Sequence, residues 1–174
     1  CRDGDLDADM VYDNSEQHPA LLRFTGGTTA LAKCAAYSLS NLWTWGLNPS
    51  HYIHVIPFPS PRGMLFSPIN HAASGSLVIP IVMKGGTILT LNRADPETIG
   101  QMTEEHRVQI FYAVPTILYR MLDMNLARRY DLSSLQTVRY GAAPISPAKL
   151  EGLLECFGRV FVQGYGSSEC WPSA

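Results

Sequence analysis

Charged residues are scarce in this sequence, and neither sign dominates. Asp, Glu, Lys and Arg make up 16% of the 174 residues, and the formal net charge is −2. A chain so balanced lacks the basic excess that binding to nucleic acid or to an anionic membrane surface requires. We therefore expect no nucleic-acid partner. Hydrophobic residues reach 46%, which is enough to build a buried core.

Cysteine is also scarce, and its spacing excludes two kinds of framework. The four cysteines lie far apart, with no Cys-x-x-Cys pair: Cys1, Cys34, Cys156 and Cys170. This spacing argues against a zinc site or a disulfide scaffold, and reduced thiols in a cytoplasmic protein are the expectation. Four histidines likewise lack the spacing of a metal cluster: His18, His51, His54 and His106.

Long apolar runs are missing as well. No run approaches the ~20 residues that cross a bilayer, and no charged-then-apolar leader opens the chain. The first residue is Cys and not Met, so we expect a fragment or a processed piece. Residues 1–18 are acidic and polar without an apolar period, which predicts a loop or a partly ordered lead-in.

From residue 19 onward, short apolar segments alternate with segments of helical periodicity. Strands are expected at 20–24, 34–37, 63–67, 87–91, 108–112, 135–140 and 160–162. Helices are expected from Ser40, Asn70, Asp95, Pro115 and Ser146. This alternation predicts an α/β fold with a mostly parallel sheet.

Capping residues support several of these helices. Asp95 precedes Pro96, Ser146 precedes Pro147, and Ser40 stands before an apolar helical segment; each is a good helix start. The last helix is expected to carry an apolar stripe: Leu150, Leu153, Leu154 and Phe157.

The first motif with chemistry follows the first expected strand. It holds glycines, threonines and a lysine within ten residues: Thr25, Gly26, Gly27, Thr28, Thr29 and Lys33. Glycines allow the backbone to approach a ligand, and the hydroxyls, freed N–H groups and lysine suit a polyphosphate. The spacing is not that of a Walker A loop. The plainer alternative is a solvated turn with a surface lysine.

Two further glycine-containing motifs come directly after expected strands. Gly141–Ala142–Ala143–Pro144 follows the strand at 135–140, and Gly164–Tyr165–Gly166–Ser167–Ser168–Glu169 follows the last strand. Open α/β sheets bind their ligands beyond the carboxyl ends of the strands. Both motifs are therefore placed to line a ligand site.

Together, the three motifs resemble those of the adenylate-forming superfamily, which includes acyl- and aryl-CoA synthetases, luciferases and peptide-synthetase adenylation domains. The first is similar to the family's Tyr-Thr-Ser-Gly-Thr-Thr-Gly-x-Pro-Lys loop, with Gly26, Ala30 and Ala32 as departures. The second and third are similar to its adenine loop and its Tyr-Gly-x-Thr-Glu motif. The order matches, and the resemblance covers nearly all of the chain from about residue 19.

This resemblance implies roles for individual residues. The threonines and glycines from Thr25 to Thr29, with Lys33, would hold the ATP phosphates. The segment 141–144 and the residues from Gly164 to Ser168 would surround the nucleotide. Glu169 would bind Mg²⁺, a role that suits a hard oxygen ligand. His71 would lie near the acyl pocket, and Lys33, His71 and Glu169 are the expected catalytic residues. A packed structural histidine remains an alternative for His71.

The activity implied is that of an ATP-dependent acyl- or aryl-CoA ligase, with a carboxylic acid, ATP and CoA as small-molecule partners. Two alternatives stay open: an adenylation domain that loads a carrier protein, and a non-catalytic nucleotide-binding module. Residues 19–174 would form part of the family's large N-terminal domain. The family's ribose-binding Asp and C-terminal lysine are not present in this chain, so we expect the isolated piece to be inactive and to self-associate.

Overall fold

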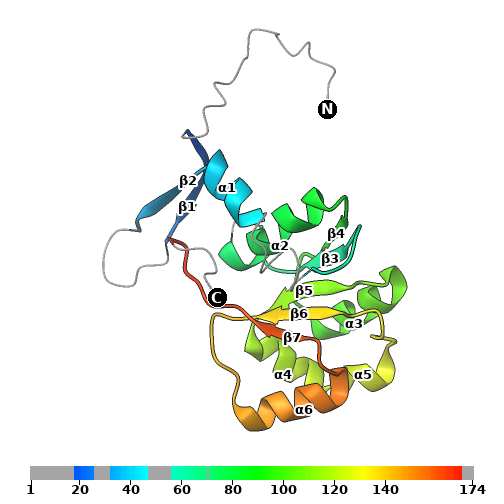
Figure 1. The fold of residues 1–174 in the computed structure, drawn as a ribbon. Helices are drawn as coiled ribbons and strands as arrows, with labels where there is room; N and C mark the ends of the chain where they lie inside the picture. The colour runs from blue at the N-terminus through cyan, green and yellow to red at the C-terminus, as the bar shows by residue number, and fades with distance from the viewer. Residues whose placement is uncertain (1–17, 26–31, 47–55, 70, 170–174) are drawn as a thin grey trace.

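The computed structural model describes residues 18–25, 32–46, 56–69 and 71–169, and its centre is a five-stranded sheet (Figure 1). The strands are β3 Arg62–Leu65, β4 Thr87–Thr90, β5 Ile110–Ala113, β6 Thr137–Tyr140 and β7 Phe161–Gln163. Their order is β4-β3-β5-β6-β7, and every neighbouring pair is parallel. The α/β class and the parallel sheet are confirmed, with strand boundaries shifted by one or two residues.

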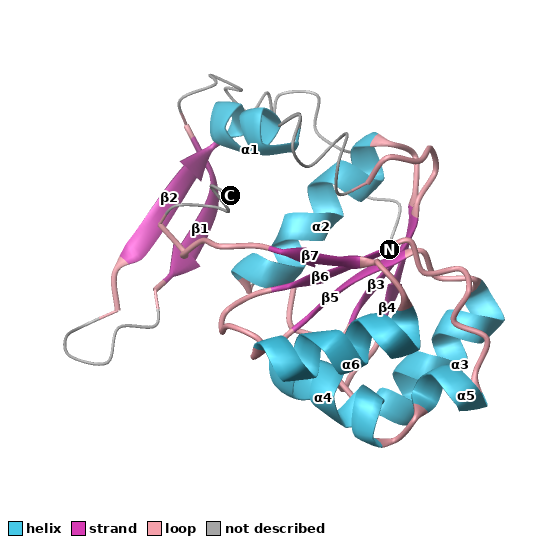
Figure 2. Cartoon of the chain, turned by 60° about the horizontal axis from the view of Figure 1, so that its bottom comes forward, coloured by secondary structure: helices cyan, strands magenta, loops and turns pink. Residues whose placement is uncertain are grey.

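Helices cover both faces of this sheet, as a parallel sheet requires. One face carries α2 Ala72–Met83, and the other carries α3 Pro96–His106, α4 Pro115–Asp123, α5 Leu126–Arg129 and α6 Pro147–Phe157 (Figure 2). No helix in the described part of the chain is long and apolar enough to cross a membrane.

Alternation along the strands divides the core into two clusters. Phe111 and Val138 pack with the helices α3–α6, whereas Ile110 packs with Leu77 of α2. Successive strand residues point to opposite faces, so the neighbours of Phe111 and Val138 face α2. One of these neighbours, Arg139, is among the residues that line the site described below.

A separate antiparallel hairpin lies beyond the carboxyl ends of the parallel strands (Figures 1 and 2). It consists of β1 Pro19–Phe24 and β2 Cys34–Ser38, with Phe24 opposite Cys34, and α1 Leu39–Gly46 follows it. Both strands were predicted from the sequence. Their pairing with each other, outside the main sheet, was not.

Two predicted helix caps are confirmed. The Asp95 carboxylate accepts a hydrogen bond from the Thr98 backbone N at 3.0 Å. Ser146 Oγ accepts one from the Lys149 N at 3.4 Å. Each satisfies a backbone donor that has no partner inside the helix.

The predicted cap of α1 is wrong. The helix begins at Leu39, so Ser40 lies inside it. Ser38 takes the capping place because its Oγ accepts from Asn41 N at 3.1 Å, while Asn41 Oδ1 accepts from Ser38 N at 3.0 Å. This reciprocal pair has the geometry of a capping box, and Ser40 has no residue placed to complete one.

The structure differs from the prediction at two further helices. The short helix α5 was not predicted, because four residues are too few to show helical periodicity. In α6 only Leu153 is fully buried, and Leu154 is 37% exposed. The helix therefore packs through a narrower stripe than its sequence predicted.

The predicted lead-in falls, except for His18, on residues that the structure does not describe.

Candidate functional site

The two motifs that follow β6 and β7 lie side by side at the carboxyl edge of the sheet. Gly164 N donates a hydrogen bond to the Tyr140 carbonyl at 2.7 Å. A Cβ on Gly141 would lie 2.4 Å from the Gly164 carbonyl oxygen, far inside van der Waals contact. Gly141 is therefore required for this close approach of two backbones.

The turn after Gly141 is held in an uncommon conformation. Ala142 has a φ of 65°, in the left-handed region that costs a residue with a side chain about 1–3 kcal/mol. Ala142 also lines the cavity described in the next paragraph. Ala143 and Pro144 continue the loop as exposed residues that do not line it.

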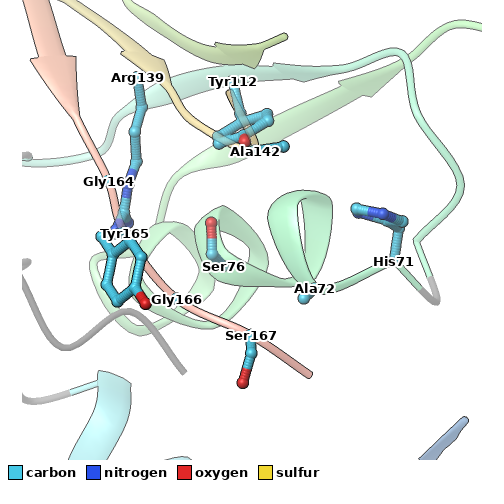
Figure 3. A pocket seen from close by; sticks show the side chains of 10 residues that line it. All are labelled: His71, Ala72, Ser76, Tyr112, Arg139, Ala142, Gly164, Tyr165, Gly166 and Ser167. Carbon is cyan, nitrogen blue, oxygen red and sulfur yellow. The ribbon is translucent and has the colours of Figure 1, made fainter. Parts of the chain in front are cut away.

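A cavity of about 80 Å³ opens between α2 and the ends of the strands (Figure 3). Its walls come from the start of α2, from β5 and β6, and from the segment after β7. The lining residues are His71, Ala72, Ser76, Tyr112, Arg139, Ala142, Gly164, Tyr165, Gly166 and Ser167. Six of the predicted site residues are thus brought together: His71, Ala142, Gly164, Tyr165, Gly166 and Ser167.

Arg139 gives the cavity a buried positive charge. Its side chain is 2% exposed and runs from β6 toward Gly164 and Tyr165 (Figure 3). Burial lowers the pKa of Arg139 to about 10, and the nearby Tyr112 phenol acts in the opposite sense. The guanidinium therefore remains charged at neutral pH. Burial also raises the pKa of Tyr112, so this phenol stays protonated.

Gly164 makes room for this guanidinium. A Cβ at Gly164 would lie 2.8 Å from Arg139 Nε, so a side chain there would displace the charged group. Sequence reasoning missed Arg139, Tyr112 and Ser76. One signal was available in the sequence: an arginine stands among the residues of a short buried strand, directly before its last residue, Tyr140.

The hairpin contacts the last motif and forms a second, adjoining cavity. The Tyr37 hydroxyl donates a hydrogen bond to the Ser168 carbonyl, and the Arg23 guanidinium lies 5.7 Å from the centre of the Tyr37 ring. Burial lowers the pKa of Arg23. The lining residues of this cavity are Arg23, Phe24, Pro68, His71, Ala72 and Ser168. His71 and Ala72 line both cavities.

The two ends of the predicted phosphate loop are tied together. Thr25 N donates to the Lys33 carbonyl at 2.8 Å, and Lys33 N donates to Thr25 Oγ1 at 3.3 Å. Lys33 is exposed. The predicted residues Gly26, Gly27, Thr28 and Thr29 lie outside the described part of the chain. What the structure does establish is a closed base for a loop that starts beside the second cavity.

Glu169 ends the motif as an exposed residue and lines neither cavity. Its backbone N donates to Ser167 Oγ at 3.3 Å. Within residues 18–25, 32–46, 56–69 and 71–169, no three His, Cys, Asp or Glu side chains cluster as a metal site would need. A Mg²⁺ ion at Glu169 would take its other ligands from phosphate oxygens and water, as this ion commonly does.

The donors of the two adjoining cavities differ in kind. Hydroxyl groups and a lysine lie on the hairpin and on the segment after Gly166, and such groups can donate to phosphate oxygens. The cavity that contains Arg139 lies against α2 and the sheet. The arrangement can therefore accommodate two neighbouring ligands, with His71 lining both cavities.

Comparisons with known proteins identify the relatives of this chain. A family model described as AMP-binding enzyme matches residues 3–174. The medium/long-chain-fatty-acid–CoA ligase FadD8 of Mycobacterium tuberculosis is 35% identical over 85% of this chain, which is 25% of that protein. A feruloyl-CoA synthase of Amycolatopsis sp. is 34% identical over 87% of the chain and 30% of that enzyme. The chain thus spans less than a third of the length of these relatives.

Solved structures give the same result for the fold. The amide bond synthetase McbA of Marinactinospora thermotolerans superposes with a TM-score of 0.80 at 27% identity, over 88% of this chain and 30% of that enzyme. The N-terminal domain of FACL13 from Mycobacterium tuberculosis gives 0.74 at 26% identity, over 85% of this chain and 36% of that domain.

Proposed function

This chain belongs to the AMP-binding enzyme family, and from that premise we propose that the protein containing it is an ATP-dependent acyl-CoA ligase. The resemblance indicated by the three motifs is confirmed by the family match and by the ligase relatives. The acid, the nucleotide, the metal and the acceptor remain parts of the proposal.

The proposed reaction has two steps. A carboxylate oxygen of the acid attacks the α-phosphorus of ATP; an O–P bond forms, and pyrophosphate leaves with the electrons of the broken P–O bond. The thiolate of CoA then attacks the acyl carbon of the mixed anhydride, and AMP leaves with its phosphate oxygen. The thiol proton passes to solvent. No oxidant or reductant is consumed.

In this scheme the phosphates lie between the hairpin and the segment after β7. Lys33 and the loop that begins at Thr25 bind the β- and γ-phosphates, and the Ser168 hydroxyl donates a hydrogen bond to the nucleotide. Glu169 holds Mg²⁺, which when bound neutralises part of the phosphate charge. Positioned charges of this kind stabilise the developing charge of the transition state.

The acid lies in the cavity between α2 and the sheet, with its carboxylate directed toward His71. This residue belongs to both cavities, which is where the acid and the α-phosphate must meet. Tyr165, 75% exposed here, and the backbone of 141–144 would enclose the adenine. Because Ala142 and Tyr165 also line this cavity, the adenine would lie directly beside the acid.

One observation carries the proposal: the hydrogen bond from Tyr37 to the Ser168 carbonyl. It joins residues 131 positions apart in the chain. By doing so, it holds β2 of the hairpin, whose two strands flank the predicted phosphate loop, against the motif that ends at Glu169. This contact supports a shared role for the two motifs.

CoA is proposed as the acceptor because two of the relatives described above are named as CoA ligases or synthases. The reaction is placed in the cytoplasm, in keeping with the free, exposed thiols of Cys34 and Cys156. The isolated 174-residue chain is proposed to be inactive and to self-associate. Exposed apolar side chains on the hairpin, Leu22 and Phe24 at 61% and 71%, support the second point.

The test is acid-dependent ATP–pyrophosphate exchange by the full-length protein, followed by product analysis with CoA, a carrier protein or an amine as acceptor. Glu169→Gln should slow adenylation ~30- to 1000-fold, because a charged metal ligand is lost. Added Mg²⁺ should recover part of the rate. Glu155→Gln, an exposed change on α6, is the matched control and should have no effect.

Two results would contradict the proposal. One is the absence of exchange with every acid of a broad panel. The other is full activity in both Glu169→Gln and Lys33→Ala, which would favour a non-catalytic module. Exchange that proceeds normally, with transfer to a carrier protein or an amine but not to CoA, would correct the acceptor only.

A further inference from the structure

A third cavity lies at the edge of the sheet opposite the candidate site, and we call it the amino-edge cavity. Its lining residues include Ser60 and Arg62 at the start of β3, Gln109 directly before β5 and Gln136 directly before β6. These strands are parallel, so their amino ends share one edge, and the motifs after β6 and β7 lie at the other. The proposed function uses none of the residues that line this cavity.

The amino-edge cavity has the size of a small-molecule site and an unusually polar wall. Its volume is about 410 Å³, within the ~300–1,000 Å³ of typical ligand pockets. Seven of the eight described residues that line it are polar: two arginines, three serines and two glutamines. None of the eight is Asp or Glu. The wall therefore suits a polar ligand, and an anion more than a cation.

Two guanidinium groups come together at the end of α3. Arg62 Nη1 donates a hydrogen bond to the His106 carbonyl at 3.1 Å, and Arg107 is the next residue of the chain. Arg107 pairs with Asp131 at 2.6 Å and donates to Ser133 Oγ at 3.4 Å. Arg62 has no carboxylate partner within the described ranges. Its positive charge is therefore not compensated by this part of the protein.

The backbone around the cavity is strained at two residues. Ser60 has a φ of 45° and Arg107 a φ of 52°, in the left-handed region that glycine adopts without a steric cost. Arg107 ends α3, where glycine is the usual residue. Its ion pair is half-exposed on both sides, at 51%, and such pairs contribute little stability. Strain of this kind is found preferentially at functional sites, and Ala142 at the candidate site is a further example.

Hydrogen bonds fix the wall that carries Arg62. Gln109 Oε1 accepts from the Arg62 backbone N at 2.9 Å, and Gln109 N donates to the Arg62 carbonyl at 2.8 Å. Ser134 Oγ donates to the Val108 carbonyl at 2.8 Å. A preformed wall lowers the entropic cost of binding a ligand. The Gln136 amide makes no side-chain hydrogen bond to the described residues, so its donors are available to one.

We propose that the amino-edge cavity binds the phosphate group of a small phosphate monoester, with Arg62 as the main contact and Arg107 and Gln136 beside it. A guanidinium binds phosphate through two parallel hydrogen bonds, and a dianionic phosphate gains more from two neighbouring arginines than a carboxylate does. The cavity is larger than inorganic phosphate, so we expect an organic group of about the size of a sugar. The inference goes beyond the proposed function and does not rest on it.

A competing role for these residues is structural. The polar groups would then only tie the end of α3 to the starts of the strands. That role predicts that substitutions of the arginines lower Tm. It also predicts that a phosphate ester binds no better than its parent alcohol, because no contact is made to the phosphate.

The experiment is isothermal titration calorimetry on the full-length protein. The probes are inorganic phosphate, glycerol 3-phosphate, ribose 5-phosphate and glucose 6-phosphate, with glycerol, ribose and glucose as parent alcohols and glucuronate as a carboxylate analogue. At least one ester should bind ~10-fold more tightly than inorganic phosphate, and its parent alcohol should not bind. Binding should weaken as the salt concentration rises, because Arg62 and Gln136 are exposed.

Four variants locate the bound phosphate. Arg62→Met should weaken ester binding ~10-fold or more, and Arg62→Lys should fall between wild type and Arg62→Met. Gln136→Glu places a like charge in the cavity and should weaken binding to a similar extent with Tm unchanged. Arg128→Met, an exposed change on α5, is the matched control and should have no effect. If Arg62→Met does not fold, Gln136→Glu decides.

Three results would overturn the inference. The first is that no ester binds, and the second is that glucuronate binds as tightly as glucose 6-phosphate. The third is that Lys33→Ala abolishes ester binding while Arg62→Met and Gln136→Glu leave it intact, which would place the phosphate at the hairpin loop. All of these readouts are binding affinities, so none of them decides whether the protein is a ligase.

Discussion

Replacing Gly141 by Ala should destabilise the junction on which both cavity motifs depend. The new Cβ would lie 2.4 Å from the Gly164 carbonyl oxygen and 3.0 Å from the Tyr112 hydroxyl. The first contact is with backbone, which cannot rotate away. The β6 and β7 ends would have to separate by about 1 Å to restore ordinary contact, against the hydrogen bond from Gly164 N to Tyr140.

Overpacking of this kind costs typically 1–3 kcal/mol, and the rigid partner places this case near ~2–3 kcal/mol. For a domain the size of this chain each kcal/mol lowers Tm by about 2–4 °C, so ~5–10 °C is the largest fall expected for the longer full-length protein. Thermal unfolding followed by circular dichroism, on the full-length protein, measures it. ATP–pyrophosphate exchange should also fall, because the cavity wall moves.

Gly152→Ala is the matched control. Its Cβ would lie 3.3 Å from Leu122 Cδ2, the free end of a flexible side chain, and Ala is favoured over Gly inside a helix by about 1 kcal/mol. The variant should therefore be as stable as wild type or more stable. If Gly141→Ala has the same Tm as Gly152→Ala, the close approach of the two strand ends is refuted.

Three other predictions follow from individual contacts. Hydrogen bonds from Thr98 hold the pKa of Asp95 below its usual value. The stability that the Asp95 carboxylate contributes is therefore present above pH ~4 and is lost as the pH falls through the folded-state pKa. Asp95→Asn should flatten the dependence of Tm on pH in this range, and an unchanged dependence would contradict the prediction. Tyr37→Phe removes the donor to the carbonyl beyond β7 and should raise KM for ATP ~3- to 10-fold with the fold intact; an unaltered KM would count against docking by the hairpin. Leu77→Ala, at a 0% exposed site, should cost about 2–5 kcal/mol in urea unfolding, whereas Leu22→Ala, 61% exposed, should stay within ~0.5 kcal/mol.

The parallel sheet could be predicted because its signals are local. Each strand is a short apolar run, and the caps at Asp95 and Ser146 mark the following helices within a few residues. The start of α1 was misplaced because two serines compete there. Asn41, three residues after Ser38, decides between them, because the two residues exchange two hydrogen bonds. A sequence reading has to recognise this pair to place the helix start.

Most of the predicted residues that line the cavity belong to the two glycine-containing motifs, and His71 was predicted from the family resemblance. Gly141 and Gly164 identify the turns because close backbone approach requires them. Arg139 could not be found in this way, since its role depends on which face of β6 it occupies and on what covers that face. Alternation gives the face, but only the packing of α2 shows that the face is a cavity wall. The pairing of β1 with β2 could not be predicted either, because it too depends on how segments pack in three dimensions.

In the proposed function, the site draws its two ligand chemistries from two parts of the fold. The parallel sheet and α2 form the cavity assigned to the acid, whose walls include the buried side chains Arg139 and Ser76. The hairpin and the exposed segment ending at Glu169 would supply the polar groups for phosphate. These parts meet at Tyr37 and Ser168, so under this proposal a change in the cavity alters the choice of acid more than the phosphate contacts. Substitutions on β6 should therefore act on KM for the acid, and substitutions on the hairpin should act on KM for ATP.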